Sequence, residues 1–175
     1  MILGCDITMR RLFCLILMFL SKKLYLRYIG LTYGQHCRFV GLRISTFGSE
    51  PYLIRLGNHV TVGPSVRFVT HDGGVWVFRD EYPNIDVFSP ITVGDNVFIG
   101  INSILLPGAN VGNNCVIGAG SVVKGTLDQG YVYAGVPAKK ICSLKQYKEK
   151  SFSKMLPTKG LDFVAKKKSL LNHFF

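Results

Sequence analysis

Large aliphatic side chains recur at every sixth position in the middle of the chain. The unbroken series consists of Val93, Ile99, Leu105, Val111, Ile117 and Val123. Four positions after the aliphatic residue stands a small or β-branched one, at Val97, Ser103, Ala109, Cys115 and Ser121. A period of six is neither the period of a helix nor the alternation of a simple strand, so it indicates a structural repeat.

Three six-residue segments make one 18-residue turn of a coil with three short strands. We expect the aliphatic residues to point into this coil and the small residues to share its narrow interior, where larger ones would overpack. Glycine follows the aliphatic residue at Gly94, Gly100, Gly112 and Gly118. We expect these glycines to take tight or left-handed backbone conformations at the corners. The sequence therefore predicts an all-β solenoid, a left-handed parallel β-helix, over residues 31–141.

The repeat is interrupted once, between Phe68 and Val93. The register holds upstream at Leu56, Val62 and Phe68, but the next interval is 25 residues, which is not a multiple of six. We therefore predict an excursion loop over residues 71–90. Loops that leave a rigid scaffold frequently carry function.

The N-terminal segment, residues 1–30, has a different composition. Its nine-residue apolar run, residues 12–20, lies between Arg10-Arg11 and Lys22-Lys23. The run is shorter than the roughly 20 residues that span a bilayer. Two compatible interpretations stay open: a helix over about residues 8–28 that caps the open end of the solenoid, or an interfacial helix with possible peripheral contact with the inner membrane leaflet.

The net charge of +11 is concentrated at the two ends of the chain. Residues 29–138 contain six Lys or Arg against seven Asp or Glu, whereas residues 142–175 form a Lys-rich tail of helical composition. The nearly neutral repeat region argues against nucleic-acid binding. The five cysteines are odd in number and form no CxxC pair. They favour a reducing, cytoplasmic location and no structural zinc or disulfide framework.

Four motifs together resemble one protein family. They are ITVGDNVFIG at residues 91–100, LPG at 106–108, IGAGSVV at 117–123 and AGVPAK at 134–139. Over about residues 40–142 the chain resembles the hexapeptide-repeat acyltransferases, and most of all the branch with galactoside, maltose and capsule or exopolysaccharide O-acetyltransferases. The resemblance implies a homotrimer that transfers acetyl from acetyl-CoA to a hydroxyl, with active sites between neighbouring subunits.

Transfer of acetyl from a thioester to an alcohol needs a base for the hydroxyl proton. A neutral imidazole suits this role because its reference pKa of about 6.5 is close to working pH. His71 stands where the coil opens into the predicted loop, and it matches the catalytic histidine of the family. His36, His59 and His173 have less informative settings, with His59 at an outward-facing corner.

The resemblance also implies a row of contacts to acetyl-CoA. The implied cofactor-binding residues are Ile101, Ala119, Lys124, Gly125, Lys139 and Lys140. Ile101 would donate its backbone N–H to the oxyanion, Ala119 would contact the pantetheine arm one coil later, and Lys139 would approach the phosphates. Lys124-Gly125 replaces the Thr-Lys that is common in the family, and Cys142 replaces a basic residue, so the phosphate contacts differ in detail.

For the acceptor, the candidates are Glu50, Trp76 and Tyr82. Glu50 either orients His71, holds a sugar hydroxyl or is a turn residue. Trp76 and Tyr82 either stack on a pyranose ring or pack the loop against the next subunit. The function predicted is O-acetylation of a saccharide, in capsule, O-antigen or exopolysaccharide assembly, without a metal.

Three other readings of the same scaffold were weighed. A zinc enzyme would need three histidines on facing walls, and only His59 and His71 lie within the coils. An antibiotic or other small-molecule acetyltransferase, or a non-catalytic scaffold, remains the alternative.

Overall fold

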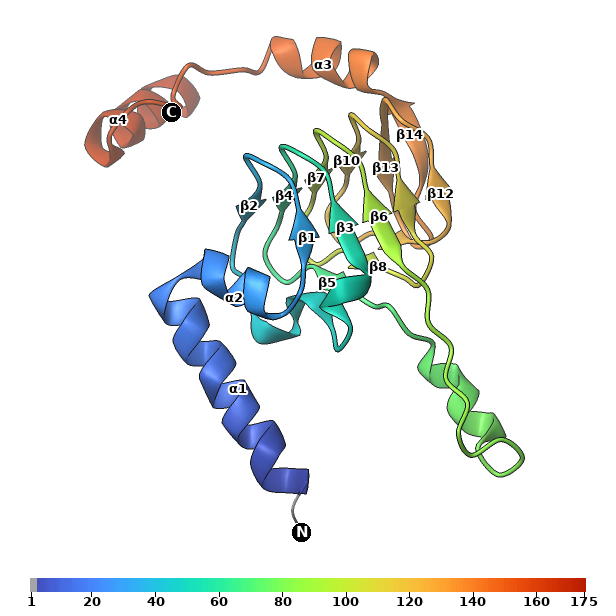
Figure 1. Ribbon diagram of the computed structural model, residues 1–175. Helices are drawn as coiled ribbons and strands as arrows, with labels where there is room; N and C mark the ends of the chain where they lie inside the picture. The colour runs from blue at the N-terminus through green and yellow to red at the C-terminus, as the bar shows by residue number, and fades with distance from the viewer. Residues whose placement is uncertain (1–2) are drawn as a thin grey trace. The chain divides into compact units, whose positions relative to one another are not determined.

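The computed structural model describes residues 3–175, with side chains described from Thr8 onward. It contains two compact units, Met1–Leu144 and Lys145–Phe175, which are treated separately below. The first unit carries the repeat region with the helices that precede it, and the second carries the basic tail (Figure 1).

Short strands of the first unit form three sheets, here called sheets A, B and C. Sheet A contains β1 (Thr32–Tyr33), β3 (Ile54–Leu56), β6 (Ile91–Val93), β9 (Asn110–Val111) and β12 (Thr126–Leu127). Sheet B contains β2 (Arg38–Phe39), β4 (Thr61–Val62), β7 (Phe98–Ile99), β10 (Val116–Ile117), β13 (Tyr131–Ala134) and β14 (Lys139–Ser143). Sheet C contains β5 (Arg67–Phe68), β8 (Ile104–Leu105) and β11 (Val122–Val123).

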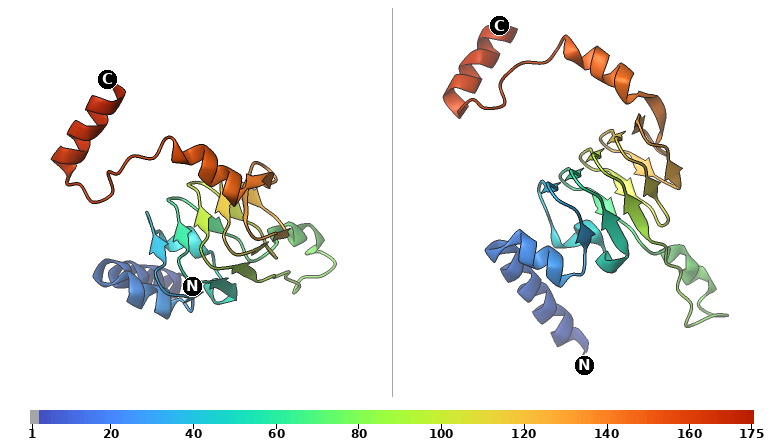
Figure 2. Two further views of the ribbon diagram at one scale, coloured as in Figure 1. Left: turned by 90° about the horizontal axis from the view of Figure 1, so that it is seen from above. Right: turned by 45° about the horizontal axis from the view of Figure 1, so that its top comes forward.

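From β6 onward the chain visits sheets A, B and C in strict rotation, so that each circuit adds one strand to each sheet (Figures 1 and 2). Every described pairing between neighbouring strands is parallel except that of β13 with β14. Partners in successive circuits are 18 residues apart, as for Asn96 and Asn114. The predicted repeat length is confirmed by this register.

The one longer circuit contains the loop. Val62 pairs with Ile99, and Asn58 contacts Asp95 at a sequence separation of 37 residues instead of 18. The extra residues leave the coil after β5 and return at β6, in the position predicted from the broken register. They include the 3-10 helix η3 (Gly73–Phe78).

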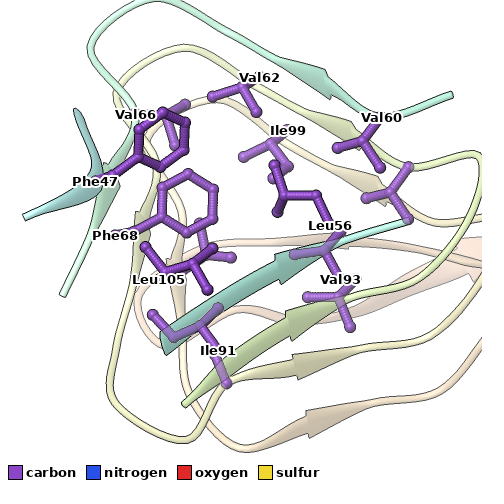
Figure 3. Packing of buried hydrophobic residues seen from close by; sticks show 14 of the residues in the cluster. Phe47, Leu56, Val60, Val62, Val66, Phe68, Ile91, Val93, Ile99 and Leu105 are labelled. Carbon is purple, nitrogen blue, oxygen red and sulfur yellow. The ribbon is translucent and has the colours of Figure 1, made fainter. Parts of the chain in front are cut away.

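The interior of the coil is filled as the periodicity predicts (Figure 3). All six aliphatic residues of the series are buried, and so are the five residues of the small slot. The hydroxyls of Ser103 and Ser121 both donate to the carbonyl of Gly118, at 3.0 and 2.7 Å, so these buried polar groups are satisfied. Aromatic packing is confined to the first coils, where the rings of Phe47 and Phe68 are 5.2 Å apart.

The repeat glycines serve a different purpose from the one expected. Their backbone is not left-handed; the positive φ angles occur two positions later, at Asn96, Asn102, Asn114 and Gly120. A Cβ on Gly100 would lie 2.6 Å from the backbone nitrogen of Ala119 in the next circuit. Glycine is therefore required by the close approach of successive coils.

The left-handed corner residues stack into a polar ladder. The Nδ1 atom of His59, whose φ is 54°, lies 2.8 Å from Oδ1 of Asn96. The side-chain amide of Asn96 donates in turn to Oδ1 of Asn114 at 2.8 Å. His59 is thus an exposed corner residue, as its place in the repeat predicts.

The segment before the coil forms two helices where one was expected. Helix α1 (Leu3–Leu20) ends before Ser21, whose extended backbone and side-chain acceptor cap α2 (Lys22–Tyr28). Tyr25 and Leu26 of α2 are buried in the core cluster. Desolvation raises the pKa of Tyr25 to about 12. No helix among the described residues has the length and apolarity needed to cross a bilayer.

Two further short 3-10 helices, η1 (Ile44–Phe47) and η2 (Pro51–Leu53), lie between β2 and β3. After β14 the chain enters α3 (Leu144–Phe152), and α4 (Phe163–Phe174) follows in the second unit. Asp162 caps α4 by accepting from the N–H of Ala165 at 2.9 Å. Neither helix has a buried side chain among its described residues.

Candidate active site

His71 stands at the base of the loop, where the chain leaves sheet C. The base is closed by antiparallel contacts: Ser89 N–H donates to Thr70 O at 2.8 Å and Asp72 N–H donates to Val87 O at 2.9 Å. Between them, His71 forms a bridge with Phe88, and their rings are 6.2 Å apart. The imidazole is therefore placed by backbone pairing on both sides.

The carboxylate of Glu50 binds the imidazole. Glu50 Oε2 lies 3.0 Å from His71 Nδ1 and accepts a hydrogen bond from the hydroxyl of Thr70 at 2.7 Å. The Glu50 side chain is 14% exposed and that of His71 is 42% exposed. A carboxylate at Nδ1 favours the tautomer with its proton on that nitrogen, which leaves Nε2 free to accept a proton.

A cavity of about 360 Å³ opens beside this pair. Its lining includes Glu50, His71 and Trp76, together with Arg79 and Asp86. Arg79 forms an ion pair with Asp86 at 2.5 Å and also donates to the carbonyl of Pro83 at 2.9 Å, which ties the loop to itself. The loop wall of the cavity is thus held by charge-assisted hydrogen bonds.

The loop exposes several large apolar side chains. Trp76 is 74% exposed and Tyr82 is 55% exposed, and Val77 and Phe78 are also exposed. Tyr82 is outside the cavity lining, so the structure brings Glu50, His71 and Trp76 together but leaves Tyr82 apart.

Ile101 and Ala119 occupy equivalent turns in successive circuits. Each follows a glycine after a sheet B strand, and the N–H of Gly120 donates to the carbonyl of Ile101 at 2.8 Å. None of the described residues accepts a hydrogen bond from the backbone N–H of Ile101 or of Ala119. Both residues are exposed, so these two donors are available to a ligand.

These donors and His71 lie on different edges of the coil. Ile101 and Ala119 lie where the chain passes from sheet B to sheet C, whereas His71 follows β5 at the edge between sheets C and A. Pro64, the neighbour of Ile101 in the preceding circuit, comes seven residues before His71. At about 3.3 Å per extended residue, sheet C separates the two edges by roughly 20 Å.

The remaining predicted cofactor residues divide between the same edges. Lys124 and Gly125 follow β11, on the edge of His71, and both are exposed. Lys139 begins β14 opposite Ala134 and is exposed. Lys140 is held within the chain: its ammonium lies 3.2 Å from Asp128 Oδ2 and 3.7 Å from the ring centroid of Tyr131. The hydrogen bond to Asp128 raises the pKa of Lys140.

Thr70 is the contact that sequence reasoning missed. Its side chain is fully buried, and its hydroxyl anchors the same Glu50 oxygen that binds His71. A polar residue in the buried register immediately before the histidine was the available signal. Elsewhere in the described residues, no three His, Cys, Asp or Glu side chains gather closely enough to hold a metal ion.

Known proteins share this repeat and this fold. Residues 90–125 match the family described as bacterial transferase hexapeptide (six repeats). Protein CapG of Staphylococcus aureus is 49% identical over 149 residues, which is 85% of this chain and 87% of CapG. The galactoside O-acetyltransferase of Escherichia coli K12 is 37% identical over 93 residues, 53% of this chain but only 45% of that enzyme.

Among solved structures, a hexapeptide-repeat acetyltransferase from Vibrio cholerae O1 in complex with acetyl-CoA superimposes with a TM-score of 0.52. It is 25% identical, and the match covers 64% of each chain. A coil of parallel sheets with this repeat defines a transferase of the hexapeptide class. The chain belongs to the hexapeptide-repeat acyltransferase family, and it is an enzyme of acyl transfer.

Proposed function

We propose that this protein transfers an acetyl group from acetyl-CoA to a hydroxyl of a saccharide. The observation that carries the proposal is the Glu50–His71 pair at the mouth of the loop cavity. An imidazole oriented by a carboxylate is a general base for a hydroxyl. The acetyl-CoA complex of the Vibrio cholerae relative supports the same donor here.

The proposed reaction begins with His71 Nε2 accepting the proton of the sugar hydroxyl while Glu50 holds Nδ1–H. The hydroxyl oxygen bonds to the thioester carbonyl carbon, and the carbonyl oxygen becomes an oxyanion. Collapse of this intermediate breaks the carbon–sulfur bond, and the coenzyme A thiolate takes the proton from the imidazolium. The products are an O-acetyl sugar and free thiol, so atoms and protons balance.

Stabilisation of the oxyanion falls to the backbone N–H of Ile101. A backbone donor aimed at an oxyanion is worth several kcal/mol in a site that excludes water. We assign the equivalent donor of Ala119 to the pantetheine arm. Lys139 is the preferred contact for the coenzyme A phosphates, with Lys124 and Gly125 further along. Lys140 is a weaker candidate because Asp128 and Tyr131 already engage its ammonium.

We further propose that the three sheets are the faces of a left-handed parallel β-helix and that three chains associate into a homotrimer. The separation of His71 from Ile101 across sheet C supports this assembly, since one chain does not bring both groups to one carbonyl. A neighbouring subunit whose Ile101 edge faces His71 completes the site. The exposed apolar side chains of the loop then have a surface to pack on.

The acceptor is proposed from the loop cavity and from the relatives. Trp76 stands at the cavity and offers a flat apolar face of the kind that stacks on a sugar ring. Galactoside O-acetyltransferase acts on a saccharide by its name, and CapG covers most of this chain. Together they support a role in the assembly of a capsule or related surface polysaccharide.

The test is release of coenzyme A thiol from acetyl-CoA across a panel of free, nucleotide-linked and lipid-linked sugars. We expect His71→Ala to lower kcat by roughly 10²- to 10⁴-fold. His59→Ala is the matched control, because His59 also contacts a side-chain oxygen through Nδ1 but lies on a corner ladder. Full activity of His71→Ala contradicts the mechanism, and acetylation of antibiotics without any sugar contradicts the acceptor.

A further inference from the structure

The outward face of α1 is apolar and uncovered. Of its described side chains only Cys14 is buried, with Leu17 and Met18 partly covered. The exposed apolar side chains of the helix are Met9, Leu12, Phe13, Leu15, Ile16, Phe19 and Leu20. Figures 1 and 2 show α1 beside α2 at the first-coil end of the sheets, with most of its surface free.

Helical geometry separates the apolar face from the charges. At 100° per residue, Leu12, Ile16 and Phe19 lie within about 40° of the direction opposite Cys14. Arg10 and Arg11 lie on the two flanks of the covered face. Phe19 is 91% exposed, although a surface helix normally turns such a residue inward.

The charge around this face selects the surface that covers it. Residues 7–49 contain no Asp or Glu, and their cations are Arg10, Arg11, Lys22, Lys23, Arg27, Arg38 and Arg43. A second copy of the same surface would bring like charges together, which disfavours that contact. An anionic bilayer offers negative headgroups to the cations and hydrocarbon to the apolar face.

We propose that α1 docks this protein on an anionic lipid bilayer, lying parallel to the membrane with its apolar face in the acyl region. The apolar run of residues 12–20 is about 14 Å long at 1.5 Å per residue, so its two basic ends reach headgroups of one leaflet. Tyr25 and Leu26 hold the adjoining helix in the protein core, which keeps α1 at the surface. The docking does not depend on the proposed acetyl transfer.

The experiment is co-sedimentation of the full chain with vesicles of equal parts phosphatidylglycerol and phosphatidylcholine, and with vesicles of phosphatidylcholine alone. Two double variants test the surface: Phe19→Glu with Leu20→Glu, and Lys22→Gln with Lys23→Gln. The control is Lys166→Gln with Lys167→Gln and Lys168→Gln in α4, which removes more charge from a different exposed segment.

We expect binding to the anionic vesicles and at least tenfold weaker binding to the neutral ones. The lysine pair should weaken binding on the order of tenfold or more, because each cation near an anionic surface contributes roughly fivefold. The apolar pair should abolish binding, and the α4 variant should leave at least half of it. Circular dichroism and thiol release with a soluble acceptor confirm that the variants are folded and separate this result from the proposed catalysis.

Equal binding to both kinds of vesicle, or loss of binding in the α4 variant alone, overturns the proposal. So does a wild-type protein that stays in the supernatant. If the apolar pair changes the oligomeric state in light scattering while vesicle binding persists, another copy of the chain covers α1 instead of lipid.

Discussion

Replacement of Glu50 by Gln tests whether this carboxylate positions the catalytic imidazole. The substitution keeps the size of the side chain and removes its charge. In the native protein one oxygen, Oε2, serves both the His71 ring at 3.0 Å and the Thr70 hydroxyl at 2.7 Å. The amide has one oxygen acceptor and one nitrogen donor, so the hydrogen bond to Nδ1–H loses its ionic partner.

The size of the effect follows from the burial of the pair. Hydrogen bonds to charged groups contribute about 1.5–3 kcal/mol, and the Glu50 side chain is only 14% exposed, so solvent screens it little. If this energy holds the imidazole in its productive orientation, its loss lowers kcat by roughly 10- to 150-fold. The KM for acetyl-CoA should stay within about twofold, because Ile101 and Ala119 lie on another edge of the coil.

The assay is steady-state thiol release at saturating acceptor, with Asp72→Asn as the matched control. Asp72 is the neighbouring carboxylate, and its Oδ1 accepts from the N–H of Gly74 at 2.9 Å instead of contacting the imidazole. We expect this control to retain kcat within about threefold. Equal losses in the two variants, or an unchanged kcat in Glu50→Gln, would refute the positioning role. A Glu50→Asp variant should recover little activity, because its shorter side chain does not reach Nδ1.

Three further predictions concern the coil and its cap. Phe68→Ala should lower the free energy of unfolding by about 3–5 kcal/mol in urea titrations, since the ring is fully buried; a loss below about 1 kcal/mol would contradict its core role. Gly100→Ala should cost about 1–3 kcal/mol in the same assay, because the added Cβ meets backbone of the next coil. Gly160→Ala, where no atom lies within 4 Å of the added Cβ, should be nearly neutral. The pKa of Tyr25 is raised to about 12, so its stabilising contribution is complete below pH 10 and is lost as pH rises from 10 to 12. Tyr25→Phe should flatten that decline, by about 2 kcal/mol at pH 12, and an unchanged slope would contradict the assignment.

The six-residue period was sufficient to predict the coil because each inward slot is filled by a local rule. An aliphatic residue at Ile99 or Leu105 and a small one at Ser103 meet the same steric demand in every circuit, so the pattern repeats in the sequence. The break after Phe68 located the loop for the same reason. The glycine rule was misread, since the approach of Gly100 to the next coil is a contact between segments 18 residues apart.

Within the candidate site, the sequence by itself determined that His71 opens the loop and that Ile101 and Ala119 occupy equivalent turns. Only the tertiary structure decided that Glu50 binds His71, because a long-range contact between an irregular turn and a loop has no periodic signature. The structure also placed His71 and Ile101 on different edges of the coil. Local patterns fix which face a side chain takes, whereas the path of the chain around three sheets fixes which side chains meet.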